Sequence, residues 1–399
     1  MRDRSIGKNK IAILFTTNHA DTLGNACRLS LVGYIADKYD ATIVTNQSRF
    51  VKEQFPSFRV TSIDGRARVG FALYADYLYG RKISRIINSL NPDICFMFME
   101  DSSVANWLDM PVIQYVHQHG YRTDRTKVGL KMVYRLFIGK IQHHRLILGL
   151  RKSYAVFVAS EQIMAILDKQ GVRNQYHLSH ALELNIYRYP LIMEAHARLS
   201  KLKAEGFFLV AYTGWVIENR GFSIMMEVTR RLVAKGIKLV LVIAGADNAF
   251  SKLIEDYKDQ NSLHDHIVNY GVVDVSLIPG ILHYADTCIS LLDDNVPAYR
   301  ISPPQKVIEY FAAGKAVICN SIETHLSLVS NEHTGLITEY DAESVSQAID
   351  RLYNDFDLLK KLSSNALEES KKYDIDKVYG KLVETMDRII SEREAGKRQ

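Results

Sequence analysis

Apolar residues in this sequence gather in short continuous runs that are separated by longer amphipathic stretches. In the first part of the chain such runs lie within residues 10–16, 41–45, 59–63, 92–99, 111–117 and 154–160. A strand of a parallel sheet is buried on both faces, so its sequence lacks the polar alternation of a half-exposed strand. The stretches at 26–39 and 71–90 have the period of a helix instead. The pattern predicts an α/β fold with a doubly wound parallel sheet.

The same alternation begins again at Phe207. Residues 207–214 and 237–245 are apolar runs, and the helical stretch 221–235 lies between them. Because 399 residues are too many for one hydrophobic core, we expect two Rossmann-like domains. The predicted boundaries are a first domain at 1–185, an interdomain segment at 186–205, a second domain at 206–370 and a C-terminal helical segment at 371–399.

Composition narrows the class of protein only a little. The chain is 47% hydrophobic and 24% charged with a formal net charge of +5, which is ordinary for a globular enzyme and gives no reason to expect nucleic acid as a partner. Its four cysteines are scattered without a C-x-x-C pair, and they indicate buried thiols in a reducing cytoplasm. We expect no signal peptide, because the run at 11–15 is too short, and no apolar stretch reaches the length of a membrane span.

Residues 300–318 predict a loop, a short helix and a buried strand. Pro304 suits the first turn of a helix, and Gly314 suits the left-handed residue that ends it. Lys306 and Glu309 then share one face of the helix near its N-terminus. Free backbone N–H groups and Lys306 would attract a phosphate there, and Glu309 would accept two ribose hydroxyls. The spacing predicts a nucleoside diphosphate site; the alternative is an exposed Lys–Glu pair on a solvated helix.

The same stretch resembles a known family. Residues 303–318, Pro-Pro-Gln-Lys-Val-Ile-Glu-Tyr-Phe-Ala-Ala-Gly-Lys-Ala-Val-Ile, are similar to the donor-site segment of family-4 glycosyltransferases, in which a common variant begins S-P-x-K. Pro303 replaces the serine of that variant, and Ser302 lies one position earlier. Many members carry a further glutamate where this chain has Ile301, a departure that bears on how the transferred sugar is held.

Further loops resemble the same family. Residues 214–221 resemble its G-R-x-x-x-x-K-G motif, with Trp215 in place of the arginine and Arg220 in place of the lysine. Residues 271–273 resemble the glycine turn beside the nucleotide base. A glycine-containing loop of the first domain, here with Gly24, helps to hold donor and acceptor in the family; an ordinary turn glycine is the alternative. The donor-binding residues that the resemblance implies are Gly24, Gly214, Arg220, Gly245, Val272, Val273, Ser302, Pro303, Lys306 and Glu309.

His117 closes the predicted strand 111–117. Pro-Val, four residues and then His resembles the first-domain strand of the family whose histidine faces the reacting sugar. An isolated histidine is more often structural, and a metal pair with His119 is a third interpretation. No carboxylate or cysteine at a supporting spacing accompanies the two histidines, so we predict no metal site. Glu100, Asp101 and Ser102 follow the preceding strand, on the side of such a sheet where ligands bind. We expect Asp101 or Ser102 to cap the next helix, and a role at the ligand site is the alternative.

The resemblance implies a retaining glycosyltransferase of GT-B architecture, with two Rossmann-like domains facing across a cleft and the last helix returning to the first domain. The donor would be a nucleotide-sugar, bound as a substrate with no further cofactor, and the acceptor a hydroxyl of a glycan or lipid-linked glycan. The implied catalytic residues are His117, Arg220, Lys306 and Glu309. Two other interpretations stay open: a sugar-nucleotide 2-epimerase of the same fold, and a non-catalytic homologue that binds a nucleotide-sugar.

Residues 125–160 contain no Asp or Glu but many basic and apolar residues. Their period suits amphipathic helices with a basic polar face. Such a helix can lie on an anionic membrane surface, and Lys131, Arg135 and Lys140 are the predicted contacts. The protein would then be cytoplasmic and peripheral on the inner face of a membrane. The alternatives are packing of the apolar face on the first domain, and a basic groove for an anionic glycan.

Overall fold

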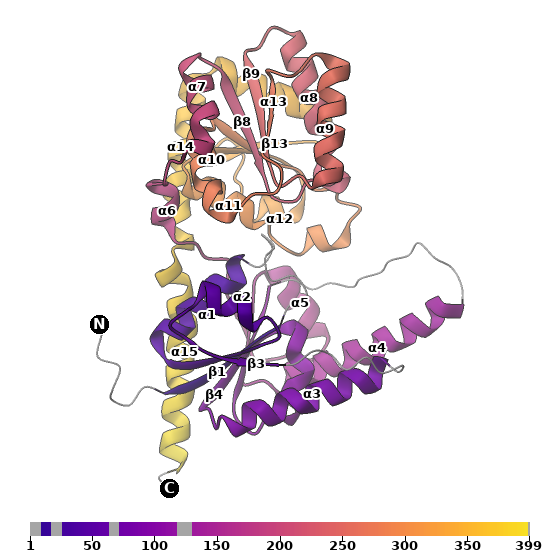
Figure 1. Ribbon diagram of the computed structural model, residues 1–399, viewed down its shortest axis with the longest axis vertical. Helices are drawn as coiled ribbons and strands as arrows, with labels where there is room; N and C mark the ends of the chain where they lie inside the picture. The colour runs from indigo at the N-terminus through magenta and orange to yellow at the C-terminus, as the bar shows by residue number, and fades with distance from the viewer. Residues whose placement is uncertain (1–8, 17–25, 64–71, 118–129, 398–399) are drawn as a thin grey trace. The chain divides into compact units, whose positions relative to one another are not determined.

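The computed structural model describes residues 9–16, 26–63, 72–117 and 130–397, which form two compact units. Residues up to Ser179 belong to the first unit together with those from Val378 onward, and His180–Lys377 make up the second. Each unit is built on its own parallel sheet, with helices packed against it (Figure 1). The apolar side chains of each unit pack within that unit, so each has its own core.

The first unit contains a seven-stranded parallel sheet in the order β3-β2-β1-β4-β5-β6-β7. Its strands are β1 (Lys10–Phe15), β2 (Asp40–Thr45), β3 (Arg59–Ser62), β4 (Ile94–Phe98), β5 (Val112–Val116), β6 (Ala155–Val158) and β7 (Gln175–His177). Every residue of β4, β5 and β6 is buried, which explains the unbroken apolar runs of the sequence. The order through the first six strands is that of a Rossmann sheet, and the prediction of a doubly wound fold is confirmed.

The strands are connected mainly by helices. These are α1 (Ala26–Lys38), α2 (Ser48–Gln54), α3 (Ala72–Ser89), the 3₁₀ segment η2 (Met99–Trp107), α4 (Leu130–Lys152) and α5 (Glu161–Lys169). At Gly149 α4 lies against η2, where an added Cβ would come within 1.8 Å of the carbonyl oxygen of Ser102. Ser102 also bonds to Gln114 of β5, whose amide donates to Ser153 Oγ at 2.7 Å. The C-terminal half of α4 is therefore held to the sheet by close backbone contact and by a buried polar chain.

The C-terminal helix α15 (Ile375–Lys397) belongs to the first unit from Val378 onward (Figure 1). The hydroxyl of Tyr39 donates to the carbonyl oxygen of Val383 at 3.2 Å and to Asp387 Oδ1 at 2.8 Å. Burial of that hydroxyl, with its bond to Asp387, raises the pKa of Tyr39 far above its usual value. The far end of the chain thus forms part of the helical layer over the first sheet.

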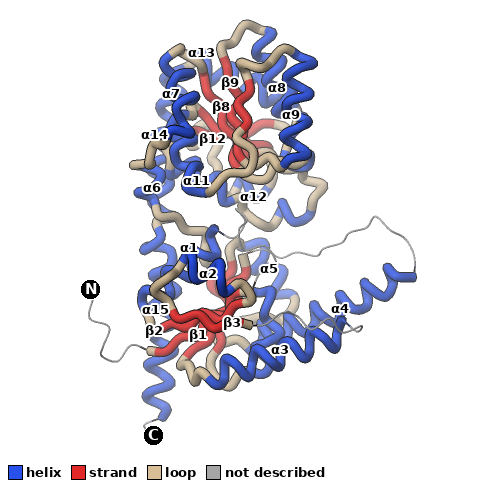
Figure 2. The backbone as a smooth tube through the Cα atoms, in the orientation of Figure 1, coloured by secondary structure: helices blue, strands red, loops and turns tan. Residues whose placement is uncertain are grey.

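The second unit contains a six-stranded parallel sheet in the order β10-β9-β8-β11-β12-β13. Its strands are β8 (Phe208–Thr213), β9 (Leu239–Ala244), β10 (Ile267–Asn269), β11 (Thr287–Ser290), β12 (Ala316–Asn320) and β13 (Gly335–Thr338). Figure 2 shows these strands in red between layers of blue helix. All residues of β8 and β9 are buried, and their side chains divide between two apolar clusters, one on each face of the sheet.

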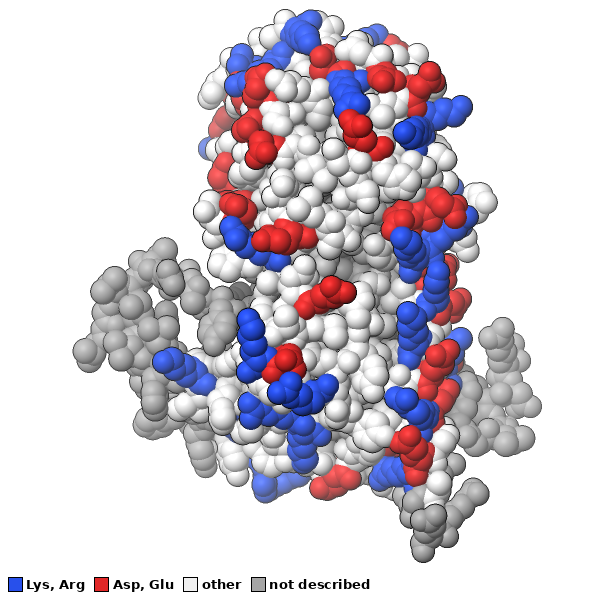
Figure 3. Space-filling view, turned by 180° about the vertical axis from the view of Figure 1, so that it is seen from behind, with Lys and Arg blue, Asp and Glu red and all other residues white. Residues whose placement is uncertain are grey.

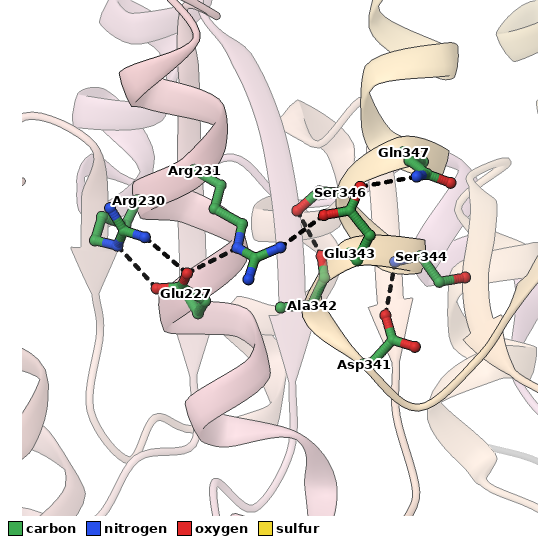
Figure 4. A network of polar contacts seen from close by, with 9 residues as sticks. All are labelled: Glu227, Arg230, Arg231, Asp341, Ala342, Glu343, Ser344, Ser346 and Gln347. Atoms are coloured by element: carbon green, nitrogen blue, oxygen red, sulfur yellow. Dashed lines mark hydrogen bonds and ion pairs between the residues drawn. The ribbon is translucent and has the colours of Figure 1, made fainter.

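One polar network joins two helices on the surface of the second unit. In Figure 4, α8 (Phe222–Ala234) and α13 (Ala342–Asn354) lie side by side, and Arg231 reaches across to Glu343 at 2.7 Å. Glu227 accepts from both Arg230 and Arg231, and these arginines lower its pKa to about 2. The side chains are 31–67% exposed, so the network adds little stability beside the apolar contacts beneath it.

The predicted interdomain segment at 186–205 is instead part of the second unit. It contains the end of α6 (Leu184–Arg188), the 3₁₀ turn η3 (Glu194–His196) and α7 (Ala197–Ala204). Tyr187, Leu199 and Leu202 are buried in the core of the second unit. The prediction of a linker was wrong because helices this short leave too weak a periodic pattern in the sequence.

Candidate active site

Two glycine loops of the second unit meet beyond the carboxyl ends of β8 and β9. Gly214 follows β8 with φ 105°, and Gly245 follows β9 with φ 122°. The N–H of Gly214 donates to the carbonyl oxygen of Ala244 at 2.8 Å. A Cβ at Gly245 would lie 2.2 Å from the carbonyl oxygen of Gly214, so a larger residue does not fit there. The loops bring bare backbone to the edge where open parallel sheets bind ligands.

Lys306 lies beside these loops at the start of α11 (Gln305–Ala312). The residue is 9% exposed, and its Nζ lies 3.7 Å from the centroid of the Tyr212 ring. A Cβ at Gly214 would be 3.4 Å from the same Nζ. Within the described ranges this nitrogen has no hydrogen-bond partner. Burial, together with the charge of Arg220, lowers the pKa of Lys306 well below its usual value.

Arg220 supplies a second cation at the same place. It ends the 3₁₀ turn η4 (Glu218–Arg220), just before α8. Its Nε donates to the hydroxyl of Tyr299 at 3.3 Å, and the guanidinium carbon lies 5.5 Å from the centroid of that ring. Among the described residues, neither Arg220 nor Lys306 forms an ion pair with a carboxylate. Two cationic side chains beside the first turn of a helix favour a bound anion.

Glu309 lies one turn after Lys306 and is half-buried. Its Oε1 accepts from Gln305 Nε2 at 3.0 Å. Burial raises the pKa of Glu309 to about 7, although Lys306 and Gln305 both favour the carboxylate. On the next residue of the helix, the hydroxyl of Tyr310 accepts from the N–H of Thr213 at 3.0 Å. This bond ties α11 to the end of β8, where Lys306 lies against Gly214.

The other predicted donor-binding residues of the second unit lie on two turns: Ser302 and Pro303 on one, Val272 and Val273 on the other. The first two are half-buried in the turn before α11. The second turn begins at Gly271, whose φ is 65° and whose carbonyl oxygen accepts from the N–H of Gly245 at 2.7 Å. Val272 is 70% exposed, while Val273 packs on the core. The structure therefore brings the turn at 271–273 next to the glycine loops.

His117 directly follows β5 in the first unit and is 9% exposed. Its Nε2 lies 4.0 Å from Glu100 Oε1, and Arg28 approaches the other oxygen of Glu100 at 3.7 Å. Burial lowers the pKa of His117, and the charge of Glu100 opposes this only in part. Burial also acts to raise the pKa of Glu100, but the charges of Arg28 and His117 outweigh it and the pKa is lowered. The site combines a neutral imidazole with an ionised carboxylate near pH 7.

The prediction that Asp101 or Ser102 caps a helix was wrong. The 3₁₀ segment η2 begins at Met99, directly after β4, with Phe98 at the cap position. Asp101 is buried, and its Oδ1 accepts from Thr16 Oγ1 at 2.7 Å. Its Oδ2 has no hydrogen-bond partner in the part of the chain that the structure describes. Burial raises the pKa of Asp101 to about 6, although the bond from Thr16 opposes this shift.

Some of the predicted site and membrane-contact residues lie outside the part of the chain that the structure describes. Gly24 and His119 lie outside the described residues, as do the side chains of Lys131 and Arg135 on α4. Lys140 is exposed on that helix. Farther along α4, Ile147 and Leu150 are buried, so the apolar face of this part packs on the first unit.

Two further findings concern the described residues as a whole. They include no group of three or more side chains placed to bind a metal ion. None of their helices combines the length and the apolar character needed to cross a membrane.

Tyr212, Tyr299 and Tyr310 were not predicted from the sequence, yet they position the site. Tyr212 lies under Lys306, Tyr299 holds Arg220, and Tyr310 anchors α11. Tyr212 and Tyr310 are fully buried and look like ordinary core residues in an apolar context. No sequence signal distinguishes these three tyrosines, because their partners Lys306, Arg220 and Thr213 lie on other elements of the second unit.

Comparison with protein families gives a match over the second unit. Residues 195–369 match the family model described as glycosyl transferases group 1. The match lies within the second unit and covers less than half of the chain. The matched range includes the glycine loops, Arg220 and all of α11. It therefore agrees with the resemblance seen in residues 303–318.

Curated relatives match this chain over short ranges. Chitobiosyldiphosphodolichol beta-mannosyltransferase of Debaryomyces hansenii is 28% identical over 160 residues, which are 38% of this chain and 33% of that protein. N,N'-diacetylbacillosaminyl-diphospho-undecaprenol alpha-1,3-N-acetylgalactosaminyltransferase of Campylobacter jejuni is 29% identical over 96 residues, 24% of this chain and 26% of that protein. The chain thus spans a third or less of the length of these relatives.

A solved structure matches this chain over nearly its whole length. HepE of Anabaena, in a crystal structure with UDP and glucose, has a TM-score of 0.72 and 13% identity, and the match covers 95% of this chain and 100% of that chain. At this identity the likeness shows the fold alone. The fold is GT-B, with two Rossmann-like domains, as the sequence predicted.

Proposed function

We propose that the protein is a retaining glycosyltransferase, which moves a sugar from a nucleotide-sugar to a hydroxyl of a glycan or lipid-linked glycan. The observation that carries the proposal is the buried Nζ of Lys306, which has no hydrogen-bond partner among the described residues. An unpaired buried polar group costs about 1–3 kcal/mol, and a bound anion removes that cost. The diphosphate of a nucleotide-sugar is such an anion, and the match of residues 195–369 to group 1 glycosyl transferases favours it as the ligand.

The proposed reaction exchanges one bond at the anomeric carbon for another. The bond from that carbon to the donor phosphate oxygen breaks, and the acceptor oxygen bonds to the carbon on the same face. The acceptor proton passes to the departing phosphate oxygen, so atoms and charge balance. Negative charge grows on the leaving diphosphate, where Lys306, Arg220 and the first turn of α11 would stabilise it. Glu309 would accept the ribose hydroxyls.

His117 is proposed to polarise a hydroxyl of the reacting sugar. Because burial lowers its pKa, the imidazole is neutral and has one nitrogen that donates and one that accepts. Glu100 lies beside Nε2 and favours a proton on that nitrogen. Among the described residues Nδ1 has no hydrogen-bond partner, which leaves it able to accept from a ligand.

The transfer reaction has a direct test. A thermal-shift panel of UDP, GDP and ADP with their hexose esters should reveal one stabilising base, since a ligand at about a hundred times its Kd stabilises by about 2.7 kcal/mol. With that nucleotide-sugar, nucleoside diphosphate should be released only when a glycan or lipid-linked acceptor is present. The anomeric configuration of the product, read by NMR, should equal that of the donor. Equal release without acceptor would favour the 2-epimerase interpretation, and binding without turnover a non-catalytic homologue.

A lipid-linked acceptor is proposed from the names of the two relatives, which specify sugars joined through diphosphate to dolichol and to undecaprenol. We also propose a peripheral contact with an anionic membrane surface on the cytoplasmic side, through α4. Lys140, Arg151 and Lys152 are exposed on this helix, and residues 125–160 contain no carboxylate side chain. Figure 3 shows Lys and Arg side chains gathered on part of the surface of the first unit. Each basic residue near such a surface adds about 1 kcal/mol.

Liposome co-sedimentation tests the membrane contact. The protein should pellet with vesicles that contain anionic lipid, remain in solution with neutral vesicles and be released by salt. A variant with Lys131, Arg135 and Lys140 changed to Ser should stay in solution. Absence of binding at low salt, or unchanged binding by that variant, would contradict the proposal while leaving the transfer reaction untouched.

A further inference from the structure

Trp215 is an exposed aromatic residue in the middle of the donor loops. It lies between β8 and η4, directly after Gly214, and is 54% exposed. None of the described aromatic rings stacks on its indole. The G-R-x-x-x-x-K-G resemblance places an arginine at this position, so a large apolar surface replaces a cation.

The backbone around Trp215 is held on both sides. The hydroxyl of Tyr212 donates to the carbonyl oxygen of Trp215 at 2.6 Å, and the ring of the same tyrosine lies under Lys306. The next residue, Val216, is 3% exposed, and its N–H donates to the carbonyl oxygen of Gly245 at 3.4 Å. A fixed loop that presents an exposed indole is a preorganised contact surface, which lowers the entropy lost when a ligand binds.

The chemistry of the indole limits what it can contact. The one polar group of the indole is its N–H, which donates a hydrogen bond. The anionic diphosphate of the proposed ligand already has Lys306 and Arg220 as cationic partners. The rest of the indole is a broad apolar face of the kind that buries well against another apolar surface. A nucleotide-sugar has two uncharged groups with such a face, the nucleobase and the sugar ring with its C–H bonds. Because Trp215 directly follows Gly214, which lies against Lys306, a ring joined directly to the diphosphate fits this position better than the base, which lies beyond the ribose.

We propose that Trp215 is a stacking platform for the apolar face of a pyranose ring held next to the diphosphate, and that it helps to determine which sugar is accepted. The proposal rests on the proposed function, because the ring would belong to the donor or to the acceptor. A ring with an axial hydroxyl on the stacked face would fit less well than one with all its hydroxyls equatorial. Trp215 would therefore act on sugar selectivity rather than on the binding of the nucleotide.

Calorimetric titration of four proteins tests the platform. The wild type, Trp215→Ala, Trp215→Phe and the control Leu253→Ala, an exposed apolar residue of the same unit, are titrated with UDP and UDP-glucose, or with the pair that the panel selects. Trp215→Ala should leave the Kd of the diphosphate within about twofold and raise that of the nucleotide-sugar about tenfold, or about 1.4 kcal/mol. Trp215→Phe should keep most of the affinity, and Leu253→Ala all of it. If only the KM for acceptor rises in Trp215→Ala, the stacked ring is that of the acceptor.

Fluorescence gives an independent readout, because the chain has only two tryptophans. In Trp107→Phe the indole of Trp215 is the sole emitter, and its spectrum should change with UDP-glucose more than with UDP. In Trp215→Phe the remaining Trp107, which packs with Tyr77 and Arg145 in the first unit, should not respond to either ligand.

Two results would overturn the platform. One is unchanged nucleotide-sugar affinity and acceptor KM in Trp215→Ala; the other is an equal loss for UDP and UDP-glucose, which would assign the indole to the nucleoside. If the wild type binds no nucleoside diphosphate at all, the proposed function itself fails. The titrations of the wild type and of Trp215→Ala therefore separate the two failures.

Discussion

Replacing Lys306 by Met tests whether the proposed donor site contains a buried amine that finds a hydrogen-bond partner only when a nucleotide binds. The Nζ of Lys306 is buried, has no hydrogen-bond partner among the described residues and lies over the Tyr212 ring. Leaving such a group unpaired costs about 1–3 kcal/mol, part of which the contact with the ring offsets. Met has a similar length, and its sulfur also packs well on an aromatic ring. Without nucleotide, Lys306→Met should therefore be more stable than the wild type by about 1 kcal/mol, or about 2–4 °C in the Tm of a unit of this size.

Nucleotide binding should change in the opposite direction. A hydrogen bond to a charged group is worth about 1.5–3 kcal/mol, so Lys306→Met should bind nucleoside diphosphate roughly 10- to 150-fold more weakly. The pKa of Lys306 is lowered in the folded state, so the unfolded chain holds more protons and the wild type loses stability as pH falls below about 10.5. The stability advantage of the variant should accordingly be larger at pH 7 than at pH 10.

Lys315→Met is the matched control, just beyond the C-terminal end of α11. The Nζ of Lys315 donates to the carbonyl oxygen of His283 at 3.0 Å, so this change removes a satisfied hydrogen bond. It should lower stability slightly, by about 0.5–1.5 kcal/mol, and leave nucleotide affinity unchanged. Scanning calorimetry and titration with UDP or the selected nucleotide measure both quantities. A lower Tm for Lys306→Met without ligand, or wild-type affinity in that variant, would refute the reasoning.

Three further predictions concern other residues of the two sites. Because burial raises the pKa of Glu309 to about 7, Glu309→Gln should weaken nucleotide binding about tenfold at pH 8, where the wild type is a carboxylate, and about twofold at pH 6. Titrations at the two pH values check this, and an equal loss at both would count against the ribose contact. Burial raises the pKa of Asp101 to about 6, so between pH 4 and 6 the folded state binds more protons than the unfolded chain. The free energy of unfolding therefore falls as pH rises from about 4 to 6. Asp101→Asn should then be up to about 3 kcal/mol more stable than the wild type at pH 8 and no more stable at pH 4, as measured by urea unfolding. His117→Ala should keep the Tm and nucleotide affinity but lower kcat by roughly 10²–10³; normal transfer, or an unfolded variant, would show that the histidine is only a core residue.

Local patterns along the chain predicted much of the fold. A strand buried on both faces must be apolar throughout, and this requirement marked β1, β4 and β8 before any pairing was known. The helical spacing of Lys306 and Glu309 also predicted that both would lie on one face of α11. These features depend on neighbours within one turn or one strand, so the sequence contains them directly.

Short elements were harder to predict. The helices within 186–205 are too brief to show a clear period, and they were interpreted as a linker although their apolar side chains enter the second core. The 3₁₀ segment η2 begins without a loop after β4, so the usual order of strand, loop and cap did not apply to Asp101. In both cases contacts with distant parts of the chain outweighed the local signal.

The sequence by itself determined the two-domain α/β class, the positions of the main strands and the residue types of the proposed donor site. Only the tertiary structure decided which of those residues lack a partner. Lys306 is an ordinary lysine in the sequence, and it becomes a buried amine with a lowered pKa because Tyr212 and Gly214 pack against it and Arg220 lies near. Burial and through-space charge depend on segments that are far apart in the chain, and no local pattern records them.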